Sequence, residues 1–383
     1  MDRAWVLLRE ADSTCGGKAA TLRRLLDAGL DVVDGVVLVV PAAAAGTRLD
    51  EALALLGPGP YAVRSSALDE DGGTVSFAGQ LLTELHVPAA EVGAAAARVA
   101  ASAGTAHARA YADAAGRGPG AVAVLVQPML APRAAGVAVT RHPVTGADVV
   151  VVEAVAGLGD GLVDGSAEPA RWVVDRLGCV RGGTDLLVHD EVRAVADLAR
   201  AAALHLGVPV DVEWALEGDR LRLLQARPLT AGARPGHESG HAELVGEERS
   251  DGADRPSGVL VRGTGAGAGL ARGPVRRVIG VDGFASVEPG DVLVCRATSP
   301  AWTPVLALAA AVVTETGGVL AHAAVVAREL GIPAVTGAAD ALARLVDGEH
   351  VLVDGRSGVV RRDGSARGPA AGAPRGTARE TAP

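Results

Sequence analysis

The chain of 383 residues carries a formal net charge of −9, and 49% of its residues are hydrophobic although only 2% are aromatic. This length predicts two or three domains with cores of Ala, Val and Leu, and the negative charge argues against general affinity for nucleic acid. The longest apolar stretches are too short to cross a bilayer and the first residues lack an export signal, which predicts a cytoplasmic protein without a membrane segment.

The first predicted helix begins at an unusual residue. Lys and Arg together number 36, and all of them except Lys18 are arginines. Lys18 follows Gly16-Gly17 and opens the segment 18–30, whose leucines recur at helical spacing. A lysine is a compact point charge that fits between phosphate oxygens, which a planar guanidinium cannot imitate. An exposed lysine without a role is the alternative.

A strand followed by a loop of glycine, serine and acidic residues is predicted over 61–87. Arg64 lies in the apolar strand, Ser65-Ser66 follow it, and Gly79 falls in a second stretch of small residues. Glycine and hydroxyl groups allow a backbone to lie close over a phosphate and to donate N–H groups to it. Ordinary surface loops have the same composition, so that alternative stays open.

Four later segments are rich in β-branched residues with alternating polarity, which predicts strands over 121–130, 149–157, 208–216 and 221–229. Together with the helix at 18–30, they predict a mixed α/β first block.

The last two of these strands form a predicted hairpin with polar residues on one face. Asp211 and Glu213 share a face because alternate residues of a strand do so, and a turn near 217–219 places Gln225 opposite Glu213. Arg227 joins them two residues further along. These carboxylate, amide and guanidinium groups suit a magnesium ion and the phosphates that it bridges. A solvated strand face with a simple ion pair is the alternative.

Composition then changes sharply. Residues 231–257 are rich in Pro, Gly, Ser and acidic residues, which predicts a flexible linker between a first domain over 1–230 and a second over 258–362. The second block alternates short apolar strands with an Ala-rich helix and is predicted to be a small α/β domain. The tail 363–383 is predicted to be disordered.

The sharpest candidate site lies in this second block. Gly317-Gly318 break a strand, a helix is predicted over 321–330, and Gly331 with Pro333 ends it. His322 therefore falls in the first turn, where free N–H groups and the helix dipole stabilise an attached phosphate. A neutral histidine can act as the nucleophile there. A core histidine with its hydrogen bonds satisfied is the alternative.

Taken together and in order, these segments resemble the phosphoenolpyruvate-utilising dikinases, the family of phosphoenolpyruvate synthase, pyruvate phosphate dikinase and the rifampin phosphotransferases. The first part of the resemblance runs through GGKAATLRRLLDAG, AVRSSALDED, SFAGQLLT and VLVQPML. It continues through GVAVTRHPVTG, AVAGLGDGLVDG, VDVEWA and LQARPLT. The segment TETGGVLAHAAVVARELGIPAV is similar to the phosphohistidine signature of the family.

The resemblance implies an α/β chain, with an ATP-grasp nucleotide-binding domain followed by a small swivelling phosphohistidine domain. In this family the histidine attacks the β-phosphate of ATP, AMP leaves, the outer phosphate passes to water or inorganic phosphate, and the phosphohistidine then phosphorylates an acceptor. ATP and Mg²⁺ are therefore the implied cofactors. His322 is the implied nucleophile. The implied ligands are Lys18, Arg64 and Arg227 for phosphates, Gln127 and Met129 for adenine, Gly79 and Thr83 in the phosphate loop, and Glu213 and Gln225 for magnesium.

The chain also departs from the family pattern. Ala321 replaces the usual serine before the histidine, Asp160 replaces a glutamate, and Ala170 replaces an aspartate. The stretch between Leu30 and Tyr61 is shorter than usual. The domain that binds the acceptor in the family has no counterpart in the sequence, so the acceptor is expected to be a small molecule, such as pyruvate or an antibiotic-like hydroxyl compound, or to be bound by a partner protein.

Two functions of different class follow. The first is an active ATP-dependent phosphotransferase. We favour it because the six residues with central roles are all present, namely Lys18, Arg64, Glu213, Gln225, Arg227 and His322. The second is a non-catalytic ATP-binding or regulatory protein that retains the fold. An ATP-grasp ligase that forms an acyl phosphate is a third possibility, but it would leave His322 and its domain without a use.

Overall fold

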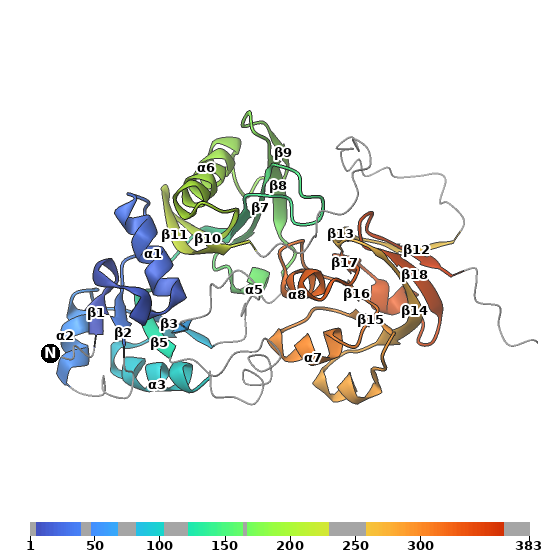
Figure 1. Ribbon diagram of the computed structural model, residues 1–383, viewed down its shortest axis with the longest axis horizontal. Coiled ribbons are helices and arrows are strands. Elements are labelled where there is room, and N and C mark those ends of the chain that lie inside the picture. Colours follow the sequence, from blue (N-terminus) through green and yellow to red (C-terminus); the bar gives the residue numbers. More distant parts are fainter. Residues whose placement is uncertain are drawn as a thin grey trace, which may run out of the picture.

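In a computed structural model of the chain, three β-sheets and their covering helices follow one another along the sequence (Figure 1). The structure describes residues 5–39, 47–67, 82–102, 122–163, 167–229 and 258–363. The predictions for the linker 231–257, for the tail beyond residue 363 and for Gly79 fall outside these residues. Within the described residues, no helix is long and apolar enough to span a membrane.

The first sheet is antiparallel and has the strand order β1-β2-β5-β3-β4. Helix α3 and part of α2 pack on one face, where Val36, Val63 and Val99 are buried. Helix α1 packs on the other face against Leu125, so the predicted helix at 18–30 and strand at 121–130 are confirmed. The elements are β1 (Trp5–Leu7), α1 (Gly17–Asp27), β2 (Val36–Leu38), α2 (Thr47–Ala54), β3 (Tyr61–Ala67), β4 (Thr83–Val87), α3 (Val92–Ser102) and β5 (Val122–Pro128).

The second sheet is also antiparallel, with the order β11-β10-β6-β7-β8-β9. Helix α6 covers one face, against which Trp172 and Trp214 are fully buried, and the left-handed Gly207 ends this helix. The elements are β6 (Ala134–Val139), β7 (Val150–Ala156), α5 (Asp160–Val163), β8 (Ala170–Val174), β9 (Val180–Gly182), α6 (His189–Leu206), β10 (Val210–Glu217) and β11 (Arg220–Pro228).

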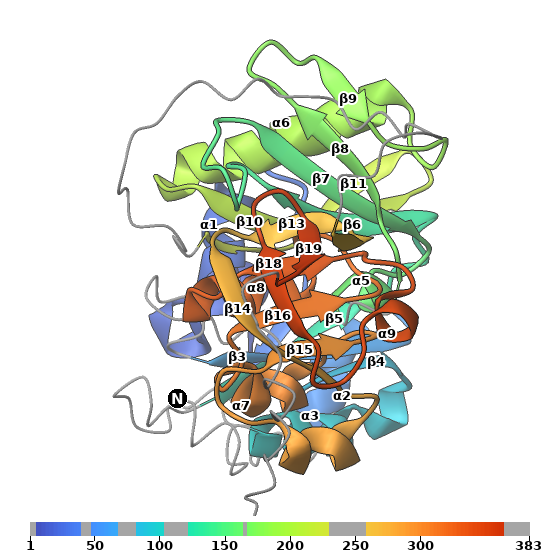
Figure 2. The same cartoon turned by 90° about the vertical axis from the view of Figure 1, so that its right-hand side faces the viewer.

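The third sheet has eight strands in the order β12-β19-β18-β14-β15-β16-β17-β13. Figure 2 looks at the molecule from the side of this sheet, with β14, β15, β16, β18 and β19 labelled. Strands β14 to β17 run parallel, and the hairpin β18–β19 extends the sheet. The strands are β12 (Val259–Arg262), β13 (Thr264–Gly267), β14 (Leu270–Arg277), β15 (Val292–Cys295), β16 (Ala311–Thr314), β17 (Ala334–Thr336), β18 (His350–Asp354) and β19 (Val359–Arg362). The helices are α7 (Thr303–Leu306), α8 (His322–Leu330) and α9 (Ala341–Arg344).

The two faces of the second sheet have different neighbours. Figure 1 shows α6 above this sheet and α8 of the third-sheet region below it. One apolar cluster joins the lower face of β6 and β7 to the surroundings of α8. Its members include Val137, Val139, Val149 and Val151 from the sheet, and Val319, Leu320 and Ala324 from the α8 region. The C-terminal part therefore packs against the face of the second sheet that α6 leaves open.

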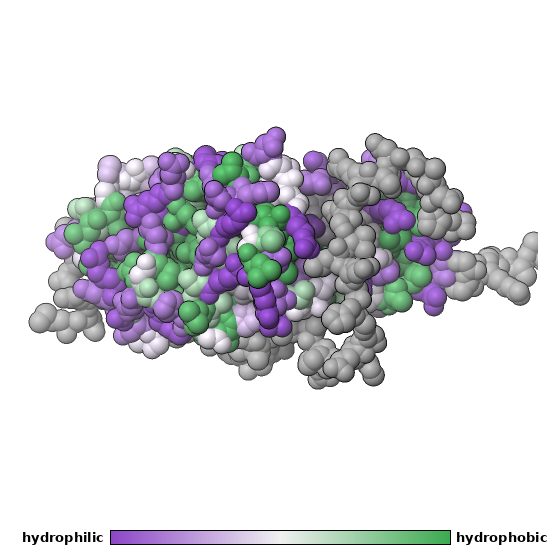
Figure 3. All heavy atoms as spheres, turned by 90° about the horizontal axis from the view of Figure 1, so that it is seen from above, coloured by the Kyte–Doolittle hydropathy of each residue, from purple (hydrophilic) through white to green (hydrophobic). Residues whose placement is uncertain are grey.

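The outer surface over α6 has a different character from this buried contact. Seen from that side, polar and apolar residues are interspersed (Figure 3). Single leucines such as Leu177, after β8, and Leu204 of α6 are exposed. Scattered apolar residues are normal on a protein surface.

Candidate active site

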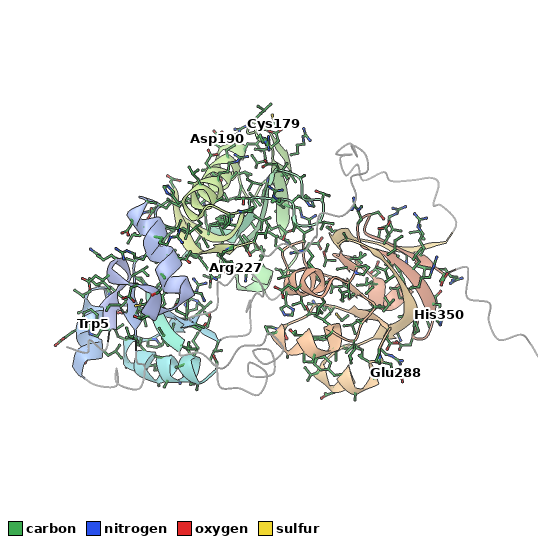
Figure 4. The ribbon with its side chains drawn as sticks, in the orientation of Figure 1. Trp5, Cys179, Asp190, Arg227, Glu288 and His350 are labelled. Carbon is green, nitrogen blue, oxygen red and sulfur yellow. The ribbon has the colours of Figure 1, made fainter. Side chains whose placement is uncertain are left out.

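The hairpin β10–β11 brings its polar residues to one place. Glu213 pairs with Gln225, as predicted, and Asp211 pairs with Arg227; a β-bulge between Glu213 and Trp214 sets this register. Arg227 donates to the Asp211 carboxylate at 2.6 Å, and it lies below the second sheet, on the side opposite α6 (Figure 4). Val212 and Trp214 point to the α6 side and are buried there. The hairpin thus presents an acidic and amide-bearing face toward the C-terminal part.

Arg64 connects this hairpin to the first sheet. One of its terminal nitrogens, Nη2, donates to Glu213 Oε2 at 2.7 Å and to Gln225 Oε1 at 3.0 Å. The other, Nη1, donates to the carbonyl oxygen of Leu224 at 3.0 Å. The carboxylate and amide oxygens therefore converge on one point that a positive charge occupies.

Three positively charged side chains act on the carboxylate of Glu213. Burial acts to raise the pKa of Glu213, but the positive charges of Arg64, Lys18 and Arg227 outweigh it and hold that pKa below its usual range. Glu213 is thus ionised at neutral pH. The effect of Lys18 also shows that α1 approaches the same cluster.

Lys18 is only 4% exposed, which argues against an exposed lysine without a role. The backbone before it is fixed by Ser66, whose hydroxyl donates to the Cys15 carbonyl at 2.8 Å and accepts from the Ala19 N–H at 3.1 Å. Gly16 has φ +86°, and a Cβ on it would lie 2.0 Å from the Ser66 carbonyl oxygen. A glycine is therefore required at position 16, both for the positive φ and for the close approach to Ser66.

The residues predicted to flank adenine lie on or after β5. Gln127 pairs with Ala62 of β3, so it shares a face with Arg64, but its amide donates to the Val33 carbonyl at 2.7 Å and its side chain is 2% exposed. Met129 is partly buried, and its N–H donates to the Pro60 carbonyl at 2.9 Å. The adenine role of both residues stays a prediction.

Of the two residues predicted to line the phosphate loop, the structure describes only one. Thr83 is exposed and pairs with Arg64 across β3 and β4. It thus shares a face with Arg64. Gly79 lies outside the described residues, so the loop itself remains a prediction.

His322 is the first residue of α8 and therefore lies in its first turn, as predicted, and it is 7% exposed. Its Nδ1 lies 2.8 Å from the Thr298 hydroxyl, whereas its buried Nε2 has no hydrogen-bond partner among the described residues. Burial lowers the pKa of His322 to about 4, so the imidazole is neutral at physiological pH. An unpartnered ring nitrogen does not fit a satisfied core histidine.

Sequence reasoning missed three residues around this histidine. Thr298 lies 24 positions before His322 and supplies a hydroxyl partner to the imidazole although Ala321 has none. Glu153 of β7 accepts hydrogen bonds from the N–H groups of Val319 and Leu320, at 2.9 and 3.2 Å. Arg328 of α8 donates to the Val319 carbonyl at 2.6 Å.

Arg328 also locates α8 relative to the hairpin. Burial lowers the pKa of Arg328 to about 10, opposed by the carboxylates of Glu153 and Asp211, while the charge of Arg227 lowers it further. Such interactions need proximity. Helix α8 therefore lies over the same face of the second sheet as Asp211 and Arg227.

A site made only of protein metal ligands is not present in the described part of the chain, where no three His, Cys, Asp or Glu residues gather. Glu213 Oε2 and Gln225 Oε1 are two oxygen atoms of the kind that magnesium prefers, and magnesium commonly completes its shell with water and substrate phosphates. The donor set therefore fits an ion that arrives with a nucleotide.

Two family models match the chain. The pyruvate phosphate dikinase AMP/ATP-binding domain matches residues 44–181 and 180–244, and the mobile domain of PEP-utilising enzymes matches residues 287–358. This chain belongs to the phosphoenolpyruvate-utilising dikinase family. Its members are phosphotransferases, and the first match is to a domain that binds AMP and ATP. The predicted fold class, an α/β nucleotide-binding domain followed by a smaller mobile α/β domain, is confirmed.

Curated relatives agree with this family. The chain is 37% identical to the phosphoenolpyruvate synthase of Aeropyrum pernix, with 78% of this chain and 44% of the relative covered. It is 35% identical to a probable phosphoenolpyruvate synthase of Archaeoglobus fulgidus (78% and 43% covered) and 36% identical to the phosphoenolpyruvate synthase of Pseudomonas aeruginosa (76% and 42% covered). The chain therefore spans less than half the length of these relatives.

Proposed function

We propose that this dikinase-family chain uses ATP to phosphorylate its own His322, releases AMP, and passes the phosphate to a separate acceptor. One observation supports the proposal most strongly. The imidazole of His322 is neutral, its Nδ1 is bonded to Thr298, and its Nε2 has no hydrogen-bond partner among the described residues. The loop before His322 is bonded to Glu153, on the sheet face that carries Glu213.

We propose that the nucleotide lies between the first sheet and the hairpin β10–β11 of the second sheet. Lys18, Arg64 and Arg227 supply the positive charges for its phosphates, since all three act on Glu213 and therefore surround one region. Gln127 and Met129 would flank the adenine, with Gly79 and Thr83 near the phosphate loop. The domain boundaries 1–230 and 258–362 are part of the same proposal.

Glu213 and Gln225 would hold Mg²⁺, whose charge when bound would neutralise phosphate oxygens and orient them. Both oxygens already converge on one nitrogen of Arg64, so their placement suits a single shared cation. In the nucleotide complex, Arg64 would then turn its guanidinium from these oxygens to a phosphate, which fits its planar fork.

The first transfer follows from the protonation of the imidazole. With its proton on Nδ1, His322 donates to Thr298 Oγ1 and keeps a lone pair on Nε2. Nε2 forms a bond to the β-phosphorus, and the bond between that phosphorus and the α,β-bridging oxygen breaks, so AMP leaves with the electron pair. Water or inorganic phosphate then removes the outer phosphoryl group, and the remaining phosphohistidine phosphorylates the acceptor.

The proposal is tested by incubating the protein with β-³²P-labelled ATP and magnesium. We expect acid-labile, alkali-stable label on the peptide that contains His322, and none in His322→Ala. His205→Ala, which alters a histidine at the end of α6, serves as the matched control and should label normally. Wild-type protein that binds ATP without taking up label would instead support the non-catalytic alternative.

A further inference from the structure

A single row of paired residues crosses the second sheet from the hairpin to β8. Gln225 pairs with Glu213, Glu213 with Val137, Val137 with Glu153, and Glu153 with Arg171. Directly paired residues of neighbouring strands point to the same face. Glu213 and Glu153 therefore share a face and are two strand spacings, or about 10 Å, apart along the sheet.

Glu153 is fully buried at the contact with the C-terminal part. Its two oxygens accept from the N–H groups of Val319 and Leu320, and Oε1 also accepts from Nε of Arg171 at 2.8 Å. A buried carboxylate is costly unless it is paired and hydrogen-bonded, and here the C-terminal part supplies two of the three donors. The contact is therefore satisfied only while the His322 loop is seated.

The loop is shaped to receive this carboxylate. A Cβ on Gly318 would lie 2.2 Å from Glu153 Oε1 and 2.4 Å from Oε2, so a side chain at this position would displace Glu153 or the loop. Thr336 holds the other side of the turn by donating to the Gly318 carbonyl at 3.1 Å. Position 318 therefore requires a glycine because Glu153, which belongs to the second sheet, leaves no room for a side chain there.

We propose that Glu153 is a positioning residue that seats the His322 loop on the nucleotide-binding face of the second sheet for the first transfer. This inference rests on the proposed function, because it gives Glu153 a part in the reaction of His322. Glu153 does not contact the imidazole. Glu153 holds the backbone at Val319 and Leu320, three and two residues before His322. It thereby sets where the imidazole lies relative to the Glu213–Gln225 pair.

The first test measures hydrogen exchange in the absence of ATP. In the wild-type protein the amides of Val319 and Leu320 should be protected, and Glu153→Ala should remove that protection. The amide of Val325, bonded within α8, should stay protected because the helix itself is intact. Asp148→Asn, which breaks an exposed ion pair near the same strand, is the matched control and should change neither amide. Protection unchanged in Glu153→Ala would overturn the seating contact.

The second test measures the single-turnover rate of His322 labelling at saturating ATP. Glu153→Ala should slow labelling at least about tenfold, because the seated position is no longer held. Affinity for a non-hydrolysable ATP analogue should remain within about twofold, because Glu153 is not in the nucleotide site. The labelling rate of Glu153→Gln, which keeps one acceptor oxygen, should lie between those of the wild type and Glu153→Ala. Labelling at the wild-type rate with an unprotected loop would overturn the positioning role.

Gly318→Ala disturbs the same contact from the loop and leaves the ion pair between Glu153 and Arg171 without a missing partner. Its labelling rate should fall in the wild-type background but change little in Glu153→Ala, since the colliding carboxylate is then gone. Equal effects of Gly318→Ala in both backgrounds would contradict the proposal. If the wild-type chain takes up no label at all, the proposed function fails, while hydrogen exchange still reports whether Glu153 seats the loop.

Discussion

At the scale of single residues, the hydroxyl of Thr298 gives the His322 imidazole a hydrogen-bond partner, whereas Ala321 directly before the histidine has no hydroxyl. The Thr298 hydroxyl lies 2.8 Å from Nδ1 of His322 and comes from the segment after β15, far from Ala321 in the sequence. Nothing local in the sequence points to this pairing, because it depends on how β15 and β16 lie side by side in the sheet. A lone glutamate among valines in 149–157 did carry a signal that Glu153 is special, but its partner could not be predicted.

Thr298→Val should slow the labelling of His322 by roughly tenfold, because the isosteric side chain leaves Nδ1 unpartnered in a buried site. Thr298→Ser keeps the hydroxyl and should retain most of the rate. The check is rapid-quench labelling with both variants at matched thermal stability. Equal rates for the valine and serine variants would show that the hydrogen bond has no part in the transfer.

The low pKa of His322 makes a second prediction. Burial lowers this pKa from 6.5 to about 4, so the folded imidazole should stay neutral in a ¹⁵N NMR titration from pH 8 to pH 5. The unfolded chain binds the proton more readily, so this histidine makes the free energy of unfolding fall as pH falls from 6.5 toward about 4. A His322 resonance that titrates near pH 6.5, assigned by its loss in His322→Gln, would contradict the buried neutral state.

Lys18→Arg keeps the charge but changes its shape. Because the side chain is buried and a guanidinium cannot sit as a point charge between phosphate oxygens, we expect the labelling rate to fall by about 10²–10³. Arg24→Lys on the same helix is the matched control and should have little effect. The two variants are compared by single-turnover labelling, and a Lys18→Arg rate within threefold of wild type would remove Lys18 from the phosphate site.

At the scale of elements, the hairpin β10–β11 was largely predictable. Alternation placed Glu213 and Asp211 on one face. The turn at Gly218 alone would set Glu213 opposite Leu224, and a β-bulge between Glu213 and Trp214 shifts the pairing to Gln225 and Arg227. The sequence could not predict that Arg64 of the first sheet would reach both oxygens, because strand pairing says nothing of which sheet packs against which. Helix α8 was predictable for a similar reason, since Gly331 with φ +70° ends it as expected.

Glu213→Gln tests the metal role of this hairpin. The substitution removes one negative charge from a site where three cations surround the carboxylate. We expect the magnesium concentration needed for half-maximal labelling to rise by at least about tenfold, with the rate partly restored at high magnesium. The measurement is a magnesium titration of the labelling rate, with Glu217→Gln at the end of β10 as a control. An unchanged magnesium dependence would exclude Glu213 as a ligand.

At the scale of the whole molecule, the chain spans less than half the length of its curated relatives. If a separate acceptor takes the phosphate from His322, as we propose, we expect the first transfer to be fast and the second to wait for that acceptor. Purified protein mixed with ATP should give a burst of about one AMP per chain and then slow turnover. Steady turnover of pyruvate at an ordinary enzymic rate, about 1–10³ per second, would show that no partner is needed.

The contact between the two parts of the chain is the feature that sequence reasoning described least well. It predicted a swivelling domain on a linker over 231–257, and those residues lie outside the described structure. It did not foresee that an apolar cluster and the Glu153 contact would join the C-terminal part to β6 and β7. Such long-range packing depends on the shape of both surfaces, which short motifs do not encode.

The central claim is that Nε2 of His322 takes the β-phosphoryl group of ATP. The most direct measurement is a single-turnover experiment with ATP labelled in turn at the α, β and γ positions, with products resolved by chromatography. Our account predicts that α-label appears in AMP, that β-label stays on His322, and that γ-label leaves as inorganic phosphate or pyrophosphate. Formation of ADP with γ-label retained on the protein would contradict it.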